Sequence, residues 1–132
     1  NLGDFIKSNI KVVLGAKNTG SVGKIAHIIL KLYKDENYYE KVYAKALKAP
    51  TSLEIIQALK TKQADTSINW KAAAFMGDNA NYVDFIDIPY IAPKQKLILT
   101  VVKYSKHPLS AKEFVDFAAS RENKKFMKSK GF

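Results

Sequence analysis

Short apolar runs alternate with stretches of helical periodicity through the first part of the chain. Residues 10–14 form a β-branched apolar run that ends at Gly15, which predicts a buried strand. Residues 22–33 place apolar side chains three and four positions apart, the spacing of an amphipathic helix. Residues 42–47 alternate weakly and predict a second strand, which Pro50 stops.

The polar residues 35–37 interrupt the first helical pattern, and Tyr38 and Tyr39 predict no more than a short helical turn after them. Residues 51–54 read Thr-Ser-Leu-Glu, a capping-box signature that opens a second helix. The middle of the chain therefore repeats the order of strand and helix seen before it.

A third strand is predicted at residues 66–70, followed by a short Ala-rich helix at residues 71–76 that ends at Gly77. Residues 83–88 alternate as a further strand, which Pro89 ends. Strands that alternate with helices predict an α/β fold with a largely parallel sheet.

The last quarter of the chain has its own pattern. Residues 94–103 predict a long strand, and Ser110 to Glu113 form a second capping box before an amphipathic helix. A short final helix carries Phe126 and Met127, and Gly131 follows it.

Composition sets limits on the function. The 132 residues are enough for one domain with a core, and 47% of them are hydrophobic. No apolar run approaches the roughly 20 residues of a membrane-spanning helix. The chain has 0 cysteines, which excludes disulfides, thiolate metal sites and cysteine nucleophiles.

The chain is strongly basic, with a formal net charge of +10. Such a charge attracts nucleic acid, anionic membrane surfaces or small anions. The lysines form no block of five or more like charges, and only Arg121 carries a guanidinium, the group best suited to phosphates and base edges. We therefore expect a solvated lysine-rich surface, with a basic nucleic-acid-binding module as the alternative.

Three polar features follow the predicted ends of three strands. They are residues 19–23 (Thr-Gly-Ser-Val-Gly), residues 51–52 (Thr-Ser) and residues 69–70 (Asn-Trp). Ligands bind at this edge of open α/β sheets, and the first two features also begin helices, whose free N–H groups suit an anion. The hydroxyls of Ser21 and Ser52 add donors, each worth roughly 1.5–3 kcal/mol to a charged ligand.

Each feature by itself also fits a structural role, as a helix cap, a turn or a core tryptophan. A phosphate loop is excluded, because Ser21 stands where that motif requires lysine after Gly20. His27 lies among apolar residues of a predicted helix, which indicates a partly buried, hydrogen-bonded side chain. No spacing of acids and histidines suggests a metal site or a hydrolase, so we expect neither an enzyme nor a cofactor.

With these residues in view, the chain resembles the substrate-binding proteins of bacterial ABC importers, most closely the molybdate-binding and tungstate-binding group. The likeness rests mainly on residues 97–132 and covers nearly the whole chain. It extends to residues 2–47, which include the glycine loop at residues 15–23, to residues 51–70 and to residues 83–89. It implies an α/β, type II periplasmic-binding-protein-like three-layer sandwich with a mostly parallel sheet. Residues 1–89 would form the second lobe, and residues 90–132 would return as a strand and helices toward the first lobe.

The resemblance also implies a site. Backbone N–H groups of Val22 and Ser52 would contact an oxyanion, and Trp70 would stand where the family has a tyrosine hydroxyl. Ser21 replaces the family's usual proline, and Asn69 is polar where an apolar residue is usual. The predicted ligand-binding residues are therefore Ser21, Val22, Ser52, Asn69 and Trp70.

The implied partners are a small oxyanion such as molybdate or tungstate and the membrane permease of an ABC transporter. The implied location is periplasmic, or extracytoplasmic on a membrane anchor. The chain would be a fragment of a longer protein, and a homodimer is expected if the first lobe is missing. An effector-binding domain of a transcription regulator is a further alternative with the same two-lobe architecture.

Overall fold

The structure is a computed structural model that describes residues 1–88, 91–93 and 95–132. It divides into two compact units, Asn1–Pro93 and Lys94–Phe132. Pro89, the predicted end of one strand, and Lys94, the predicted start of another, lie outside the described residues.

The first unit is built on the strand β1 (Val12–Gly15), whose four residues are all buried. The strands β2 (Leu47–Ala49) and β3 (Thr66–Ser67) pair with β1 on either side and run parallel to it, in the order β2-β1-β3. A central parallel strand is covered on both faces, which explains why the sequence around it is almost wholly apolar. The first predicted strand and the parallel sheet are confirmed.

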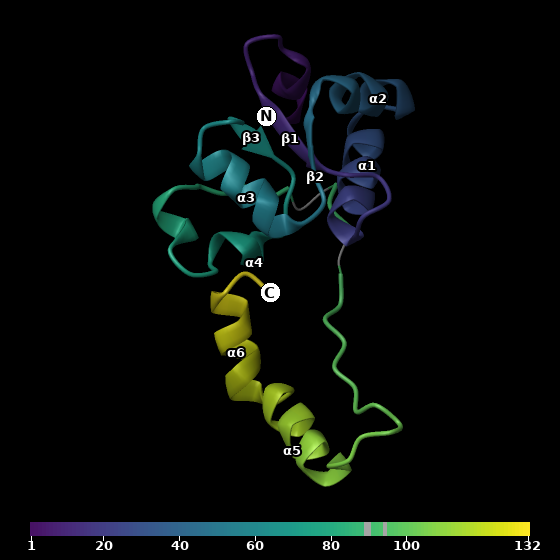
Figure 1. The fold of residues 1–132 in the computed structure, drawn as a ribbon, viewed down its shortest axis with the longest axis vertical. Coiled ribbons are helices and arrows are strands. Elements are labelled where there is room, and N and C mark those ends of the chain that lie inside the picture. The colour runs from purple at the N-terminus through teal and green to yellow at the C-terminus, as the bar shows by residue number, and fades with distance from the viewer. Residues whose placement is uncertain (89–90, 94) are drawn as a thin grey trace. The chain divides into compact units, whose positions relative to one another are not determined.

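Helices cover both faces of this sheet, as Figure 1 shows. Successive side chains of a strand point to opposite faces, so β1 serves two cores. Val12 and Leu14 pack with α1 (Ser21–Tyr33) and α2 (Glu36–Lys45). Val13 packs against α3 (Ser52–Lys60) in a second buried cluster. The result is the predicted three-layer arrangement of helices, sheet and helix.

The predicted strand at residues 42–47 is wrong over most of its length. The helix α2 extends through Lys45, and only the last predicted residue enters β2. The polar break before it is the start of this helix, because the Asp35 carboxylate accepts the backbone N–H of Tyr38 at 2.6 Å. Tyr38, Tyr39 and Val42 are all buried, at the three-residue and four-residue spacing of a helix face.

The later strand predictions were also wrong, in the length of one strand and in the existence of two others. Of residues 66–70, only Thr66 and Ser67 form β3, and the short helix α4 (Lys71–Ala74) begins after Trp70. In the described part of the chain, residues 83–88 and 95–103 form no strand. An extended segment becomes a strand only when a neighbour pairs with its peptide groups, and alternation in sequence does not supply that neighbour.

Two 3-10 helices complete the first unit. The helix η1 (Leu2–Ile6) buries Leu2 and Phe5 against the α1 and α2 side of the core. The helix η2 (Asn79–Asn81) follows Gly77, which has a φ of +58°, the left-handed region that glycine tolerates. The predicted Ala-rich helix thus ends earlier than expected, at Ala74.

The second unit contains α5 (Pro108–Ala118) and α6 (Arg121–Ser129). The predicted capping box at Ser110 is wrong, because α5 begins at Pro108, whose fixed φ suits the first helical position. None of the residues of α5 and α6, all of which the structure describes, is buried. Phe114 and Phe117 are 61% and 64% exposed. Among the described residues, no helix has the length and apolar character to cross a bilayer.

The cap of α2 yields a direct test of the corrected assignment. We expect Asp35→Ala to lower the free energy of unfolding by about 1 kcal/mol, because it removes the acceptor for the Tyr38 N–H. Asn37→Ala is the matched control: Asn37 is exposed in the first turn of the same helix, and its replacement leaves the cap intact. Urea denaturation measures both changes. Equal stability of the two variants would contradict the assigned cap.

Candidate functional site

The three predicted strand-end segments lie at one edge of the sheet. Because β2, β1 and β3 are parallel, their carboxyl ends meet at the same edge. The Ala16 N–H donates to the Ala49 carbonyl at 2.9 Å, just after β1 and β2 end. Val22 and Trp70 pack into one apolar cluster. The structure thus brings residues 19–23, 51–52 and 69–70 to a common edge.

The amino end of α1 is the most open of these segments. Within the described residues, no side chain caps this helix, and its first turn contains no acidic residue. The first N–H groups of a helix lack partners inside the helix and carry about half a positive charge. At this end Ser21 is exposed and Val22 is buried. Lys24, in the first turn of the helix, adds an exposed positive charge. This arrangement favours an anion.

The amino end of α3 is already partly occupied by its own side chains. The Thr51 hydroxyl accepts the Glu54 N–H, and the Glu54 carboxylate accepts the Thr51 N–H, both at 3.2 Å. The predicted capping box is therefore confirmed. Its carboxylate supplies a negative charge at the helix end, so a ligand finds free N–H groups only at Ser52 and Leu53.

Asn69 ties two of the segments together. Its side-chain amide donates to the Ser52 carbonyl at 3.0 Å, and its side-chain oxygen accepts the Trp70 N–H at 2.8 Å. Both groups of the amide are therefore engaged with backbone. Trp70 is half-buried and packs against both apolar clusters. Contact of Asn69 and Trp70 with a ligand stays a prediction.

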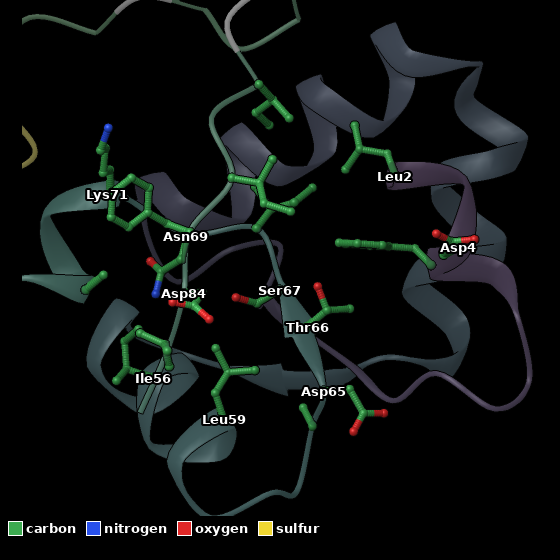
Figure 2. Close-up of a pocket in the computed structure, with 18 of the residues that line it drawn as sticks. Leu2, Asp4, Ile56, Leu59, Asp65, Thr66, Ser67, Asn69, Lys71 and Asp84 are labelled. Atoms are coloured by element: carbon green, nitrogen blue, oxygen red, sulfur yellow. The ribbon is translucent and has the colours of Figure 1, made fainter. Parts of the chain in front are cut away.

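A cavity of about 620 Å³ opens on the outer side of β3, and sequence reasoning did not find it. Figure 2 shows Thr66 and Ser67 on its wall with the carboxylates of Asp65 and Asp84. Asn69 and Trp70 contribute to its lining, whereas residues 19–23 and 51–52 do not. In its lining the carboxylates of Asp4, Asp65 and Asp84 outnumber the ammonium of Lys71, which does not favour an anion. The signal in the sequence was the alternation at residues 83–88, most of which line the cavity instead of pairing as a strand.

Two glycines place the amino end of α1 directly on the end of β1. A Cβ atom at Gly23 would lie 2.3 Å from the Ala16 carbonyl oxygen, and one at Gly15 would lie 2.6 Å from the Gly23 backbone nitrogen. Both distances are far below van der Waals contact, so only glycine fits at either position. This close approach brings the free N–H groups of α1 to the edge of the sheet.

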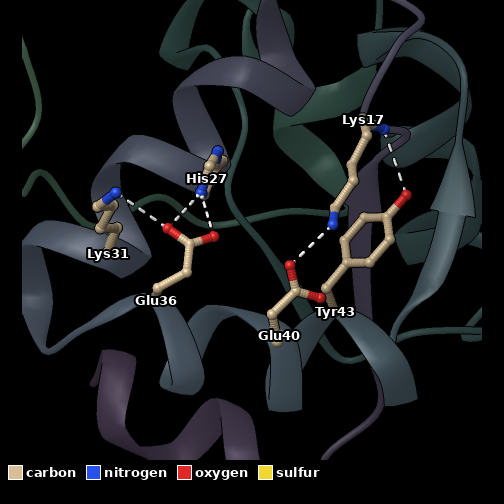
Figure 3. A network of polar contacts seen from close by, with 6 residues as sticks. All are labelled: Lys17, His27, Lys31, Glu36, Glu40 and Tyr43. Carbon is tan, nitrogen blue, oxygen red and sulfur yellow. Dashed lines mark hydrogen bonds and ion pairs between the residues drawn. The ribbon is translucent and has the colours of Figure 1, made fainter.

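The charged side chains behind this edge form a network between α1, α2 and the loop that follows β1 (Figure 3). His27 is half-buried and contacts the Glu36 carboxylate at 2.7 Å, as expected for a hydrogen-bonded histidine in a helix. Lys31 lies 3.1 Å from the same carboxylate, and its hydrogen bond is the main cause that lowers the pKa of Glu36. In the part of the chain that the structure describes, no three His, Asp or Glu side chains gather as a metal site would need.

The family model of bacterial extracellular solute-binding proteins matches residues 1–132. The chain belongs to the bacterial extracellular solute-binding proteins. None of the curated proteins matches it. Among solved structures, it is similar to PEB3 with L-phospholactate bound, at a TM-score of 0.63 and 15% identity. At that identity the likeness shows the fold, and it confirms the predicted periplasmic-binding-protein-like α/β architecture.

The match with PEB3 covers 99% of this chain and 57% of that chain. The chain therefore spans a little over half the length of its structural relative. The family and the fold agree with the resemblance drawn from the sequence, but neither of them indicates molybdate or tungstate as the solute.

The glycine contact at the edge generates a second prediction. We expect Gly23→Ala to destabilise the protein by roughly 1–3 kcal/mol, because its methyl group would force α1 away from the Ala16 carbonyl. Gly3→Ala is the control, because the atoms nearest its added methyl belong to the Asn1 and Tyr33 side chains and not to backbone. We expect a smaller loss there, at most that of the bond between the Gly3 N–H and the Asn1 side chain. Thermal unfolding followed by circular dichroism measures both. An unchanged melting temperature for Gly23→Ala would show that the close approach is not needed.

Proposed function

We propose that this chain supplies one wall of the ligand site of an extracytoplasmic solute-binding protein that serves an ABC transporter. Family membership supports the class of protein, and the fold supports the two-lobe architecture of such proteins. The partners are then a small solute and a membrane permease, and the location is periplasmic or extracytoplasmic on an anchor. The protein acts by binding and release of its solute, without catalysis or a cofactor.

The solute carries an oxyanion group, such as molybdate, tungstate or the phosphate of a small organic acid. The observation that carries this proposal is the uncapped, acid-free amino end of α1, exposed at the carboxyl edge of the sheet. The N–H groups of Ser21 and Val22 and the Ser21 hydroxyl point to an oxygen-rich anion as the matching ligand. Ser52 contributes a further donor from α3. The L-phospholactate bound to PEB3 has a phosphate and a carboxylate, which are ligands of the same chemical kind.

The second wall of the site comes from protein outside residues 1–132. Ser21 is exposed, and the other predicted ligand-binding side chains at this edge are only half-buried (Ser52, Asn69 and Trp70). A ligand bound at this edge would therefore contact protein on one side and solvent on the other. On an open surface, water competes with the ligand for these donors. Closure of the first lobe would exclude water and strengthen each contact. The 57% coverage of PEB3 supports the view that most of the first lobe has no counterpart in these residues.

Isothermal titration calorimetry on the full-length protein tests the function. The panel consists of molybdate, tungstate, sulfate, phosphate and L-phospholactate, with lactate as an analogue without the phosphate. We expect saturable heat with at least one of the oxyanions and a much weaker response to lactate. No heat with any oxyanion would reject the proposal.

Ser21→Asp should change stability and ligand affinity in opposite directions, which denaturation and calorimetric titration measure separately. A carboxylate at this position faces the free N–H groups of α1, so we expect the free energy of unfolding to rise by about 0.3–1 kcal/mol. The same charge repels an oxyanion, so the affinity falls by roughly tenfold or more. Asn37→Asp is the matched control, because it places an equal charge in the first turn of α2, away from the site. Unchanged affinity in Ser21→Asp would remove α1 from the site.

A further inference from the structure

The loop from Ala16 to Gly20 joins β1 to the open end of α1, and it has few bonds of its own. Residues 17–20 are exposed. Inside the loop, the Thr19 N–H and hydroxyl both donate to the Ala16 carbonyl, at 3.4 and 3.2 Å. A loop of small polar residues with so little internal bonding loses considerable conformational entropy when it is ordered. Its position therefore depends on what lies beside it.

Lys17 connects this loop to α2 through both its backbone and its side chain, as Figure 3 shows. Its backbone N–H donates to the Tyr43 hydroxyl at 3.2 Å, and its ammonium group donates to the Glu40 carboxylate at 2.8 Å. The same ammonium lies 5.2 Å from the ring centre of Tyr39 and 5.1 Å from that of Tyr43, within the range of cation–π attraction. One residue of the loop thus makes three kinds of contact with one face of α2.

The face of α2 that receives Lys17 is itself fixed. Tyr39 is only 1% exposed, and burial raises the pKa of its hydroxyl to about 12. Its ring packs against His27 of α1 at 4.2 Å and against Tyr43 at 5.4 Å between ring centres. The contact partners of Lys17 on α2 are therefore packed against α1 through Tyr39 and His27.

The charge of Lys17 is satisfied within the protein. Its hydrogen bond to Glu40 raises the pKa of the ammonium above its ordinary value of 10.5, so Lys17 stays protonated and paired at neutral pH. The pair is partly exposed, with 45% of the Lys17 side chain and 52% of the Glu40 side chain open to solvent. The carboxylate and the two rings nevertheless give the ammonium a defined position against α2.

We propose that Lys17 is a positioning residue: by tying the loop to Glu40 and Tyr43, it presets the free N–H groups at the start of α1 and so sets the affinity for the oxyanion. The inference rests on the proposed function for its ligand, but the anchoring of the loop is measurable without one. A preordered loop lowers the entropy cost of binding, because less order is created when the ligand arrives.

Tyr43→Phe tests the anchor, because it removes the hydroxyl that accepts the Lys17 N–H and keeps the ring. We expect amide hydrogen exchange in the ligand-free protein to rise roughly three- to tenfold at Thr19, Gly20 and Ser21, whose described hydrogen bonds do not involve Tyr43. The affinity for molybdate and for L-phospholactate, titrated separately, should fall by a similar factor. Glu40→Gln, which removes the charge and keeps the shape, should act in the same direction.

Tyr33→Phe is the matched control. It makes the same chemical change at the far end of α1, about 18 Å along the helix from Ser21. We expect its exchange rates at residues 19–21 and its anion affinities to equal those of the unmodified protein. Melting temperatures of all variants separate loss of the anchor from general loss of stability.

The outcomes are distinguishable. Unchanged exchange at residues 19–21 in Tyr43→Phe would overturn the inference whether or not a ligand binds. Faster exchange with unchanged affinity for both probes would overturn the link between the anchor and binding. If the unmodified protein binds neither probe, the proposed function fails for these ligands, and the exchange rates still decide whether Lys17 anchors the loop.

Discussion

The architecture of the first unit depends on the contact between the end of β1 and the first turn of α1. Gly15 and Gly23 approach so closely that neither tolerates even a methyl group. This contact places a helix start, with its unpaired donors, against the edge of a parallel sheet. The two cores on either side of β1 then fix where α2 and α3 lie, and hence where the other parts of the candidate site lie.

The local electrostatics of helix ends explain more about the candidate site than the total charge does. The net charge of +10 is spread over the chain and indicates no particular ligand. The amino ends of α1 and α3 both carry hydroxyl residues, but they already differ in the sequence, where Glu54 completes a capping box only at α3. The structure confirms this difference, because Glu54 supplies a negative charge at α3 and nothing acidic lies in the first turn of α1. An anion therefore meets a stronger positive field at α1.

The described residues leave apolar surface that their own fold does not bury. Phe114 and Phe117 on α5 are mostly exposed, and the cavity beside β3 has apolar walls. Extended surfaces of this kind normally lie against other polypeptide.

Much of the fold was predictable because the pattern was local. A few neighbouring residues were enough to predict three elements: the buried run of β1, the periodic residues of α1 and the capping box of α3. The same holds for the position of the candidate site, since parallel strands bring their carboxyl ends together. The role of Asp35 as a helix cap was not predicted, because a polar break is equally compatible with a loop and with a helix start. The buried face of Tyr38, Tyr39 and Val42 in the structure decides between the two.

Only the tertiary structure decided the features that depend on partners distant in the chain. Residues 83–88 have the alternation of a strand, but no neighbour pairs with them in the described part of the chain, so they line a cavity instead. Asn69 resembled a ligand donor, yet its amide bonds the Ser52 carbonyl, 17 residues away. Lys17 resembled one more surface lysine, although Tyr43, 26 residues later, holds its backbone. The sequence by itself determined the elements and the edge where donors gather, because those follow from neighbouring residues. The bonds that engage the Asn69 amide and the Lys17 N–H are made across the fold, and no local pattern encodes those contacts.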